Sequence, residues 1–136
     1  QMLYTGLKKK KIKVVSDQFS IPTSTFDFSK LIWIASKKML QSSKFDGLYH
    51  YSGSGKAISW YDFAKAIFFN AKKIGYNSPL VIPISSDQYK SIAKRPKYSC
   101  LNINKSIKAF DIFNQSWKVS LKEVLKEFFA NNNLYL

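Results

Sequence analysis

The chain has 136 residues, of which 46% are hydrophobic and 16% aromatic, enough to fill the core of one domain and too many for a disordered chain. Its single cysteine, Cys100, excludes an internal disulfide and a metal site built on cysteines. The net charge of +14 comes from 21 lysines and one arginine spread along the chain. Because nucleic-acid readers usually depend on arginine, we attribute this charge to coding bias rather than to nucleic-acid binding.

No stretch of the chain approaches the roughly 20 consecutive apolar residues that a membrane span needs. The run at 31–35 is short and falls inside a helical pattern. The beginning, Gln1-Met2-Leu3-Tyr4, lacks the features of a secretory signal. We therefore expect a cytoplasmic protein without membrane contact.

Hydrophobic spacing predicts three elements in the first third of the chain. Residues 2–10 form the tail of a helix, and residues 12–15 form a short β-branched strand. After a loop, Thr23 or Ser24 caps a helix that runs to about Gln41. The side chains expected to face the core on this helix are Phe28, Leu31, Ile32, Trp33, Ala35 and Met39.

The middle of the chain contains the clearest helix signal. Residues 48–51 predict a strand, which closes in a turn at 52–55. Ser59 then begins a helix with Asp62 three residues later, a close variant of the capping box, and Gly75 is a plausible left-handed stop. The aromatic residues of the first turn could stack on a base or sugar, although core contacts are more usual for such positions: Trp60, Tyr61 and Phe63.

Short apolar segments make up the last third. Residues 81–84 are expected as an edge strand because Pro83 cannot donate a ladder hydrogen bond, and 87–93 as one helical turn. A short helix follows at about 102–110, and Ser116 caps the last helix. The apolar stripe of that helix comprises Trp117, Leu121, Val124, Leu125 and Phe128. This order of helices and strands indicates an α/β or α+β unit.

Two polar segments near the start are candidates for ligand binding. Asp17-Gln18 follows a predicted strand directly, which is the usual place for ligand contacts in an α/β unit. An ordinary turn, with Asp17 bonding backbone amides, explains the same residues equally well. Thr23 follows Pro22 and could likewise be no more than the start of a helix.

Arg95 is the only arginine in a chain rich in lysine, which suggests a position that needs a planar, forked donor. Pro96 fixes the backbone just after it. Two parallel N–H bonds from a guanidinium would suit a diphosphate. A surface ion pair or the cap of a helix C-terminus is the alternative, and the residues alone favour neither.

Other chemically suggestive residues support no site. The segment 52–56 lacks the first glycine of a P-loop, and Ala57 stands where Ser or Thr should bind magnesium, so we predict a turn. His50 is the only histidine, so it cannot build a metal cluster or a Ser–His pair; it lies half-buried on a strand or at a cleft edge. Cys100 is interpreted as an inert buried thiol. The eight carboxylates are scattered, and none pairs with another for acid–base work.

Four short motifs carry a family resemblance. In chain order they are Asp17-Gln18-Phe19-Ser20-Ile21-Pro22-Thr23, Gly47-Leu48-Tyr49-His50, Trp60-Tyr61-Asp62-Phe63-Ala64 and Ala93-Lys94-Arg95-Pro96-Lys97-Tyr98-Ser99-Cys100-Leu101. They resemble D-Q-x-G-x-P-T, G-x-Y-H, W-x-x-[FY]-A and A-x-R-P-x-x-S-x-L in the C-terminal half of dTDP-4-dehydrorhamnose reductases, which are extended short-chain dehydrogenases. The resemblance covers nearly the whole chain. Ser20 departs from it, because the family usually has glycine there.

The resemblance implies an α+β fold: a small C-terminal substrate-binding domain, residues 1–136, with helices packed on a few short strands and no complete Rossmann unit. It places Gln1 downstream of the family's catalytic Tyr–Lys pair and of its Gly-rich cofactor turn. We therefore expect no catalytic, cofactor-binding or metal-binding residue in this chain, and no reductase activity from it alone.

In that family NADPH or NADH reduces the 4-keto group of dTDP-4-dehydro-L-rhamnose, a step of dTDP-L-rhamnose synthesis. The resemblance implies that a missing N-terminal half or a partner chain binds the cofactor. This chain would bind the dTDP-sugar nucleotide through Gln18, Thr23 and Arg95, with Arg95 at the phosphates. It also allows a homodimer. Two alternatives remain: a free-standing, non-catalytic sugar-nucleotide-binding or regulatory relative, and a basic nucleic-acid-binding domain.

Overall fold

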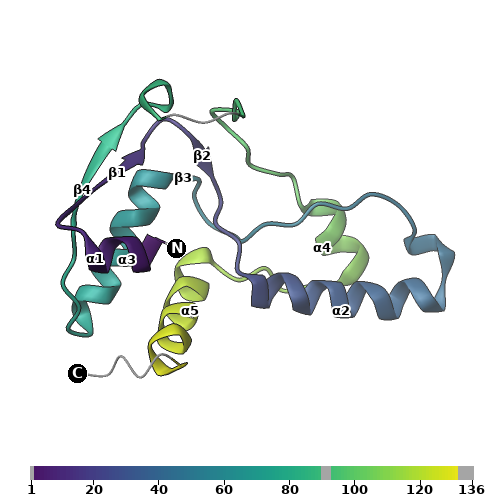
Figure 1. Cartoon of the computed structure of the whole chain (residues 1–136). Helices are drawn as coiled ribbons and strands as arrows, with labels where there is room; N and C mark the ends of the chain where they lie inside the picture. Colours follow the sequence, from purple (N-terminus) through teal and green to yellow (C-terminus); the bar gives the residue numbers. More distant parts are fainter. Residues whose placement is uncertain (1, 90–92, 132–136) are drawn as a thin grey trace.

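The structure is a computed structural model that describes residues 2–89 and 93–131. It contains helices and short strands in the mixed order expected of an α+β unit (Figure 1). The helices are α1 Met2–Lys8, α2 Thr25–Gln41, α3 Trp60–Lys73, α4 Asn104–Phe110 and α5 Trp117–Asn131, with 3₁₀ turns at Ser43–Phe45 and Ser86–Gln88. The strands are β1 Lys11–Val15, β2 Phe19–Ser20, β3 Ile58–Ser59 and β4 Leu80–Ile84.

The larger of the two sheets pairs β1 with β4 in parallel, from Lys11 opposite Leu80 to Val15 opposite Ile84. A two-stranded sheet has only edge strands, so Pro83 costs no ladder bond to a further neighbour. The expected edge strand is therefore confirmed, and it begins one residue earlier than the sequence indicates.

The second sheet is an antiparallel pair of two-residue strands, β2 and β3. Phe19 lies opposite Ser59 in this pair and also forms an isolated bridge to Tyr98. Strands of two residues leave no alternation to detect, so the sequence could not indicate this sheet. Its effect is to tie the segment after β1 to the start of α3 and to the Arg95 segment.

The main core lies between the β1–β4 pair and three helices. Phe68 and Ala64 of α3 pack on Ile12 of β1, and α5 covers the next face of α3 (Figure 1). The buried residues between α3 and α5 are Ile67, Ala71, Trp117, Leu121, Leu125 and Phe129. Trp117 is thus a core residue, as its helical position predicts.

A separate apolar cluster forms between α2 and α4, which lie side by side away from the β1–β4 pair (Figure 1). Its buried members are Leu31, Phe110 and Ile112. Tyr49 and Tyr51 pack against it from the segment before β3. Among the described residues, this cluster is separate from the two that α3 forms with α5 and with β1.

The helix boundaries follow the local signals in the sequence. Ser24 caps α2 by accepting a hydrogen bond from the Phe26 amide, and Ser59 caps α3 by accepting one from the Asp62 amide at 3.0 Å. Gly75 has φ of 91°, the left-handed geometry that ends a helix. These predictions are confirmed because capping depends on residues only a few positions apart.

The predicted strand at 48–51 is wrong. No strand forms there, and two of the carbonyls of this segment accept hydrogen bonds from side chains. Lys105 Nζ donates to the Leu48 carbonyl at 2.9 Å, and the Ser106 hydroxyl donates to the carbonyl of His50. A strand needs a neighbouring backbone to pair with, and none of the described segments pairs its backbone with this one.

Burial also differs from the sequence prediction at several side chains. On α2, Leu31 is buried, but Trp33 is 64% exposed and Phe28 and Ile32 are exposed as well. His50 is exposed rather than half-buried, and it does not lie on a strand. Cys100 is only half-buried. The expected turn at 87–93 is a 3₁₀ turn at Ser86–Gln88, and positions 90–92 lie outside the described residues.

Candidate functional site

The polar segment after β1 begins with a clamp between the two parallel strands. Asp17 Oδ1 accepts a hydrogen bond from the Ser86 amide at 2.8 Å, and Oδ2 accepts one from the Ser86 hydroxyl at 2.9 Å. The side-chain bond from Ser86 contributes most to holding the pKa of Asp17 below its usual 3.8, and Lys97 lowers it further. The carboxyl ends of β1 and β4 are thereby joined. Asp17 acts as the turn residue that the sequence allowed, and its two oxygens are engaged.

Backbone hydrogen bonds of Phe19 bring the segments of Gln18 and Arg95 side by side. The Phe19 amide donates to the Lys97 carbonyl at 2.7 Å, and the Ser99 amide donates to the Phe19 carbonyl at 3.0 Å. Gln18 comes one residue before Phe19, and Arg95 comes two residues before Lys97, the two residues that this first backbone hydrogen bond joins. Gln18 and Arg95, which are 77 positions apart in the chain, therefore lie on adjoining segments.

The side chains of Gln18 and Arg95 keep their polar groups available. Gln18 is partly buried and Arg95 is exposed. Over residues 2–89 and 93–131, neither side chain makes a hydrogen bond, and the ion pair found there is Lys30–Asp27. Neither a surface ion pair nor a helix cap accounts for Arg95 in this part of the chain.

Thr23 is already engaged in the fold. Its hydroxyl donates to the Ile21 carbonyl at 3.3 Å and accepts from the Gly53 amide at 3.1 Å. The bond from Gly53 holds the turn before α2 against the turn at 52–54. The structure does not bring Thr23 into contact with Gln18 or Arg95. Its predicted role in binding substrate stays a prediction.

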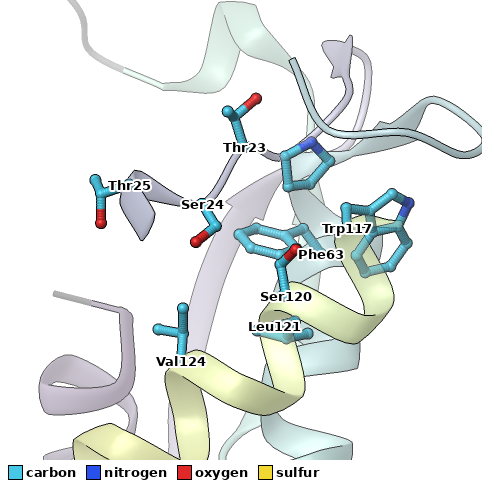
Figure 2. A pocket seen from close by; sticks show the side chains of 9 residues that line it. Thr23, Ser24, Thr25, Phe63, Trp117, Ser120, Leu121 and Val124 are labelled. Atoms are coloured by element: carbon cyan, nitrogen blue, oxygen red, sulfur yellow. The ribbon is translucent and has the colours of Figure 1, made fainter. Parts of the chain in front are cut away.

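A pocket of about 240 Å³ opens beside Thr23, between the start of α2 and the first two turns of α5. Figure 2 shows Thr23, Ser24 and Thr25 along one side, α5 residues opposite and Phe63 between them. The lining residues are Pro22, Thr23, Ser24, Thr25, Phe63, Trp117, Ser120, Leu121 and Val124. Hydroxyl groups on one wall and aromatic carbon on the other would suit a small ligand with polar and apolar faces.

Asp27 and Ser120 form a buried hydrogen bond at this pocket that the sequence analysis missed. Ser120 Oγ donates to Asp27 Oδ2 at 2.5 Å, and Asp27 is only 7% exposed. Burial, and to a lesser extent the charge of Asp27, raises the pKa of Tyr51. Ser24 and Asp27 stand at capping-box spacing, a pattern that suggests a local hydrogen-bond partner for Asp27. In the structure its hydrogen-bond partner is Ser120, 93 positions away.

The described residues contain no group of three or more His, Cys, Asp and Glu side chains that could hold a metal ion. They also contain no helix long and apolar enough to cross a bilayer. The polar features are the Gln18–Arg95 junction and the hydroxyl-lined pocket, connected by the short segment 19–22. Both lie in a small α+β unit of the kind that the element order predicts.

The family of this unit is shown by its match over residues 1–130 to the sequence model described as "RmlD substrate binding domain". The chain belongs to this family. A dTDP-4-dehydrorhamnose reductase from Aggregatibacter actinomycetemcomitans is 40% identical over 126 residues, covering 90% of this chain and 42% of the relative. The "Spore coat polysaccharide biosynthesis protein SpsK" of Bacillus subtilis (strain 168) is 32% identical, covering 93% of the chain and 40% of the relative.

Solved structures show the same fold. The dTDP-4-dehydrorhamnose reductase from Clostridium acetobutylicum superposes with a TM-score of 0.77 at 33% identity, over 93% of this chain and 42% of that one. The reductase from Bacillus anthracis str. Ames, solved in complex with NADP, gives 0.76 at 31% identity, with coverages of 93% and 41%. The chain thus spans about two fifths of the length of these relatives and corresponds to their substrate-binding portion.

Proposed function

We propose that this chain is the substrate-binding portion of a dTDP-4-dehydrorhamnose reductase, which reduces the 4-keto group of a dTDP-linked sugar. The family match and the names of the relatives support this proposal. The observation that carries it within the structure is the junction at Phe19, which places two unengaged polar side chains, Gln18 and Arg95, on adjoining segments.

Each residue of the proposed site has a distinct role in binding. Arg95 offers a planar pair of donors for the diphosphate, while the Gln18 amide can both donate to and accept from the sugar or base. Thr23 has a lone pair left on its hydroxyl and lines the neighbouring pocket. The binding energy of the nucleotide then positions the distant keto carbon for reaction.

The reaction also needs a cofactor, which we assign to polypeptide outside this chain. NADPH or NADH supplies the hydride, and the B. anthracis relative was solved with NADP. In the described residues, Ser52–Lys56 forms no phosphate-binding loop at a helix start, because α3 begins four residues later at Trp60. The cytoplasmic location and the homodimer stay predictions.

The test uses a chimeric chain in which the part of the A. actinomycetemcomitans reductase outside the match is fused to residue 1 of this chain. We expect NADPH-dependent reduction of dTDP-4-dehydrorhamnose by the chimera, and none by these 136 residues alone. Binding of the sugar nucleotide to the chimera without any NADPH oxidation would favour a non-catalytic relative. Failure to bind the sugar nucleotide would overturn the proposal.

A further inference from the structure

Positive charge is concentrated in two segments of the chain that fold together. Residues 1–16 and 63–86 contain eight of the 21 lysines and none of the eight Asp and Glu residues. These segments supply α1, β1, most of α3 and β4, which contact one another in the fold. The excess of lysine over carboxylate is therefore a property of one part of the molecule, in addition to the general lysine content of the chain.

Several of these lysines lie near the end of the larger sheet at which both strands begin. Lys11 lies opposite Leu80, the first residue of β4, and the Leu80 amide donates to the Lys10 carbonyl at 2.9 Å. The last turn of α3 carries Lys72 and Lys73, and residues 74–79 connect it to β4. Figure 1 shows this end on the side of the molecule away from α2 and α4. The basic end, as we call it, comprises Lys9, Lys10, Lys11, Phe69, Lys72, Lys73, Ile74 and Leu80.

The basic end combines exposed charges with exposed apolar side chains. All five of its lysines are exposed, and over residues 2–89 and 93–131 none of them forms an ion pair. Phe69 is 62% exposed, Ile74 50% and Leu80 58%. Lys73 Nζ lies 4.5 Å from the centroid of the Phe69 ring, so a charge and an apolar group are presented side by side. Apolar groups gathered on such a surface indicate a partner that has an apolar layer of its own.

We propose that the basic end binds the surface of a lipid bilayer that contains anionic lipids. The lysine ammonium groups attract the lipid phosphates, while the lysine stems and the three apolar side chains enter the headgroup region. Adsorption of this kind needs no spanning segment, so the proposal replaces the expectation of no membrane contact. A nucleic acid offers the same phosphates, but its backbone has no apolar layer that would bury Ile74 and Leu80.

The location of the basic end leaves the candidate ligand site open to solution. Gln18 follows the carboxyl end of β1, whereas the basic end lies at the amino end of the same strand. Adsorption through the amino end therefore directs the junction at Phe19 away from the bilayer. This inference goes beyond the proposed function and does not depend on it.

The first experiment measures sedimentation of the chain with lipid vesicles. Vesicles of phosphatidylglycerol and phosphatidylcholine in equal parts should bind the chain, and vesicles of phosphatidylcholine alone should bind it far more weakly. The double variant Lys10→Glu, Lys73→Glu should lower the affinity for the anionic vesicles by about 30-fold or more. No binding of the unaltered chain to the anionic vesicles would overturn the inference.

The matched control carries the same change in net charge at the other end of the molecule. Lys37→Glu, Lys108→Glu alters two exposed lysines, one on α2 and one on α4. Its affinity for the anionic vesicles should fall far less than that of the double variant at the basic end. Equal losses from the two double variants would overturn the inference, because total charge rather than the basic end would then govern binding.

A second pair of variants separates a bilayer from a nucleic acid as the partner. Phe69→Ser should lower the affinity for the anionic vesicles about fivefold, because it removes a ring that the headgroup region would bury. It should leave the affinity for a short DNA duplex unchanged. Phe113→Ser is the control, because Phe113 is 87% exposed outside the basic end, and it should change neither affinity. If the variants at the basic end weakened DNA binding and left vesicle binding intact, the surface would belong to nucleic acid and the inference would fail.

Discussion

At the scale of single residues, Arg95 is the position where both the side-chain chemistry and the exposure suit phosphate binding. Its guanidinium is exposed, and lysine could supply the same charge without the planar fork. In the chimera we expect Arg95→Lys to lower kcat/KM for the dTDP-sugar about tenfold, equivalent to about 1.4 kcal/mol. Steady-state kinetics with saturating NADPH measures this loss.

The neighbouring Lys94 provides the control for that measurement. Lys94→Ala removes an exposed charge from the same segment without touching the fork. It should change kcat/KM much less than Arg95→Lys does. Wild-type kinetics for Arg95→Lys would show that the planar fork of Arg95 is not needed, and equal losses from the two variants would mean that the loss is not specific to the guanidinium.

Asp17 should make the stability of the chain depend on pH. Hydrogen bonds from Ser86 lower its pKa in the folded state below 3.8. The charged form therefore stabilises the fold at pH values above 3.8, and this contribution is lost as the pH falls through the lower, folded pKa. The Tm difference between wild type and Asp17→Asn should be largest near neutral pH and shrink in acid.

Asp46→Asn is the matched control for the titration, because Asp46 is exposed between α2 and β3. Its Tm should follow that of wild type at all pH values. A difference between wild type and Asp17→Asn that stays constant from neutral to acid pH would show that the carboxylate charge contributes nothing.

At the scale of elements, the hydrogen bond from Ser120 to Asp27 connects α5 to the first turn of α2. Ser120→Ala would leave a buried carboxylate oxygen without its donor, and we expect a loss of about 1–3 kcal/mol in the free energy of unfolding. Ser36→Ala makes the same chemical change at an exposed position of α2 and should cost far less. Urea denaturation of both variants measures the two losses, and equal values would contradict the role of the buried bond.

The start of a helix could be predicted where the residues that determine it lie close together in the chain. The caps Ser24 and Ser59 act within three residues, so the sequence identifies both helix starts. The exposure of Trp33 was not predictable, because helical spacing gives a stripe but not which neighbour covers it.

The candidate site shows the same division. Arg95 and Gln18 were identifiable from residue type and position, but the bonds that join their segments run from Phe19 to Lys97 and Ser99. Asp27 was missed because its partner, Ser120, comes from the other end of the chain. Contacts of this kind are decided by how the elements pack, which no local pattern records.

At the scale of the whole molecule, the net charge of +14 predicts weak, non-specific attraction to nucleic acid. Lysines can neutralise phosphates, but a single arginine gives little capacity to read bases. Fluorescence anisotropy with a short DNA duplex should show binding at low salt that weakens steeply, by a factor on the order of 10³ or more between 50 and 200 mM if six or more phosphates are contacted.

The same duplex with an unrelated sequence should bind equally well at each salt concentration, since counterion release does not depend on sequence. The affinity of the chimera for the dTDP-sugar should fall much less, because one diphosphate carries few charges and the proposed contact to Gln18 carries none. Salt-resistant binding that discriminates between the two duplexes would make the basic surface a nucleic-acid site. A flat salt dependence for the sugar nucleotide beside a steep one for DNA would separate recognition by the Phe19 junction from the attraction of the lysines.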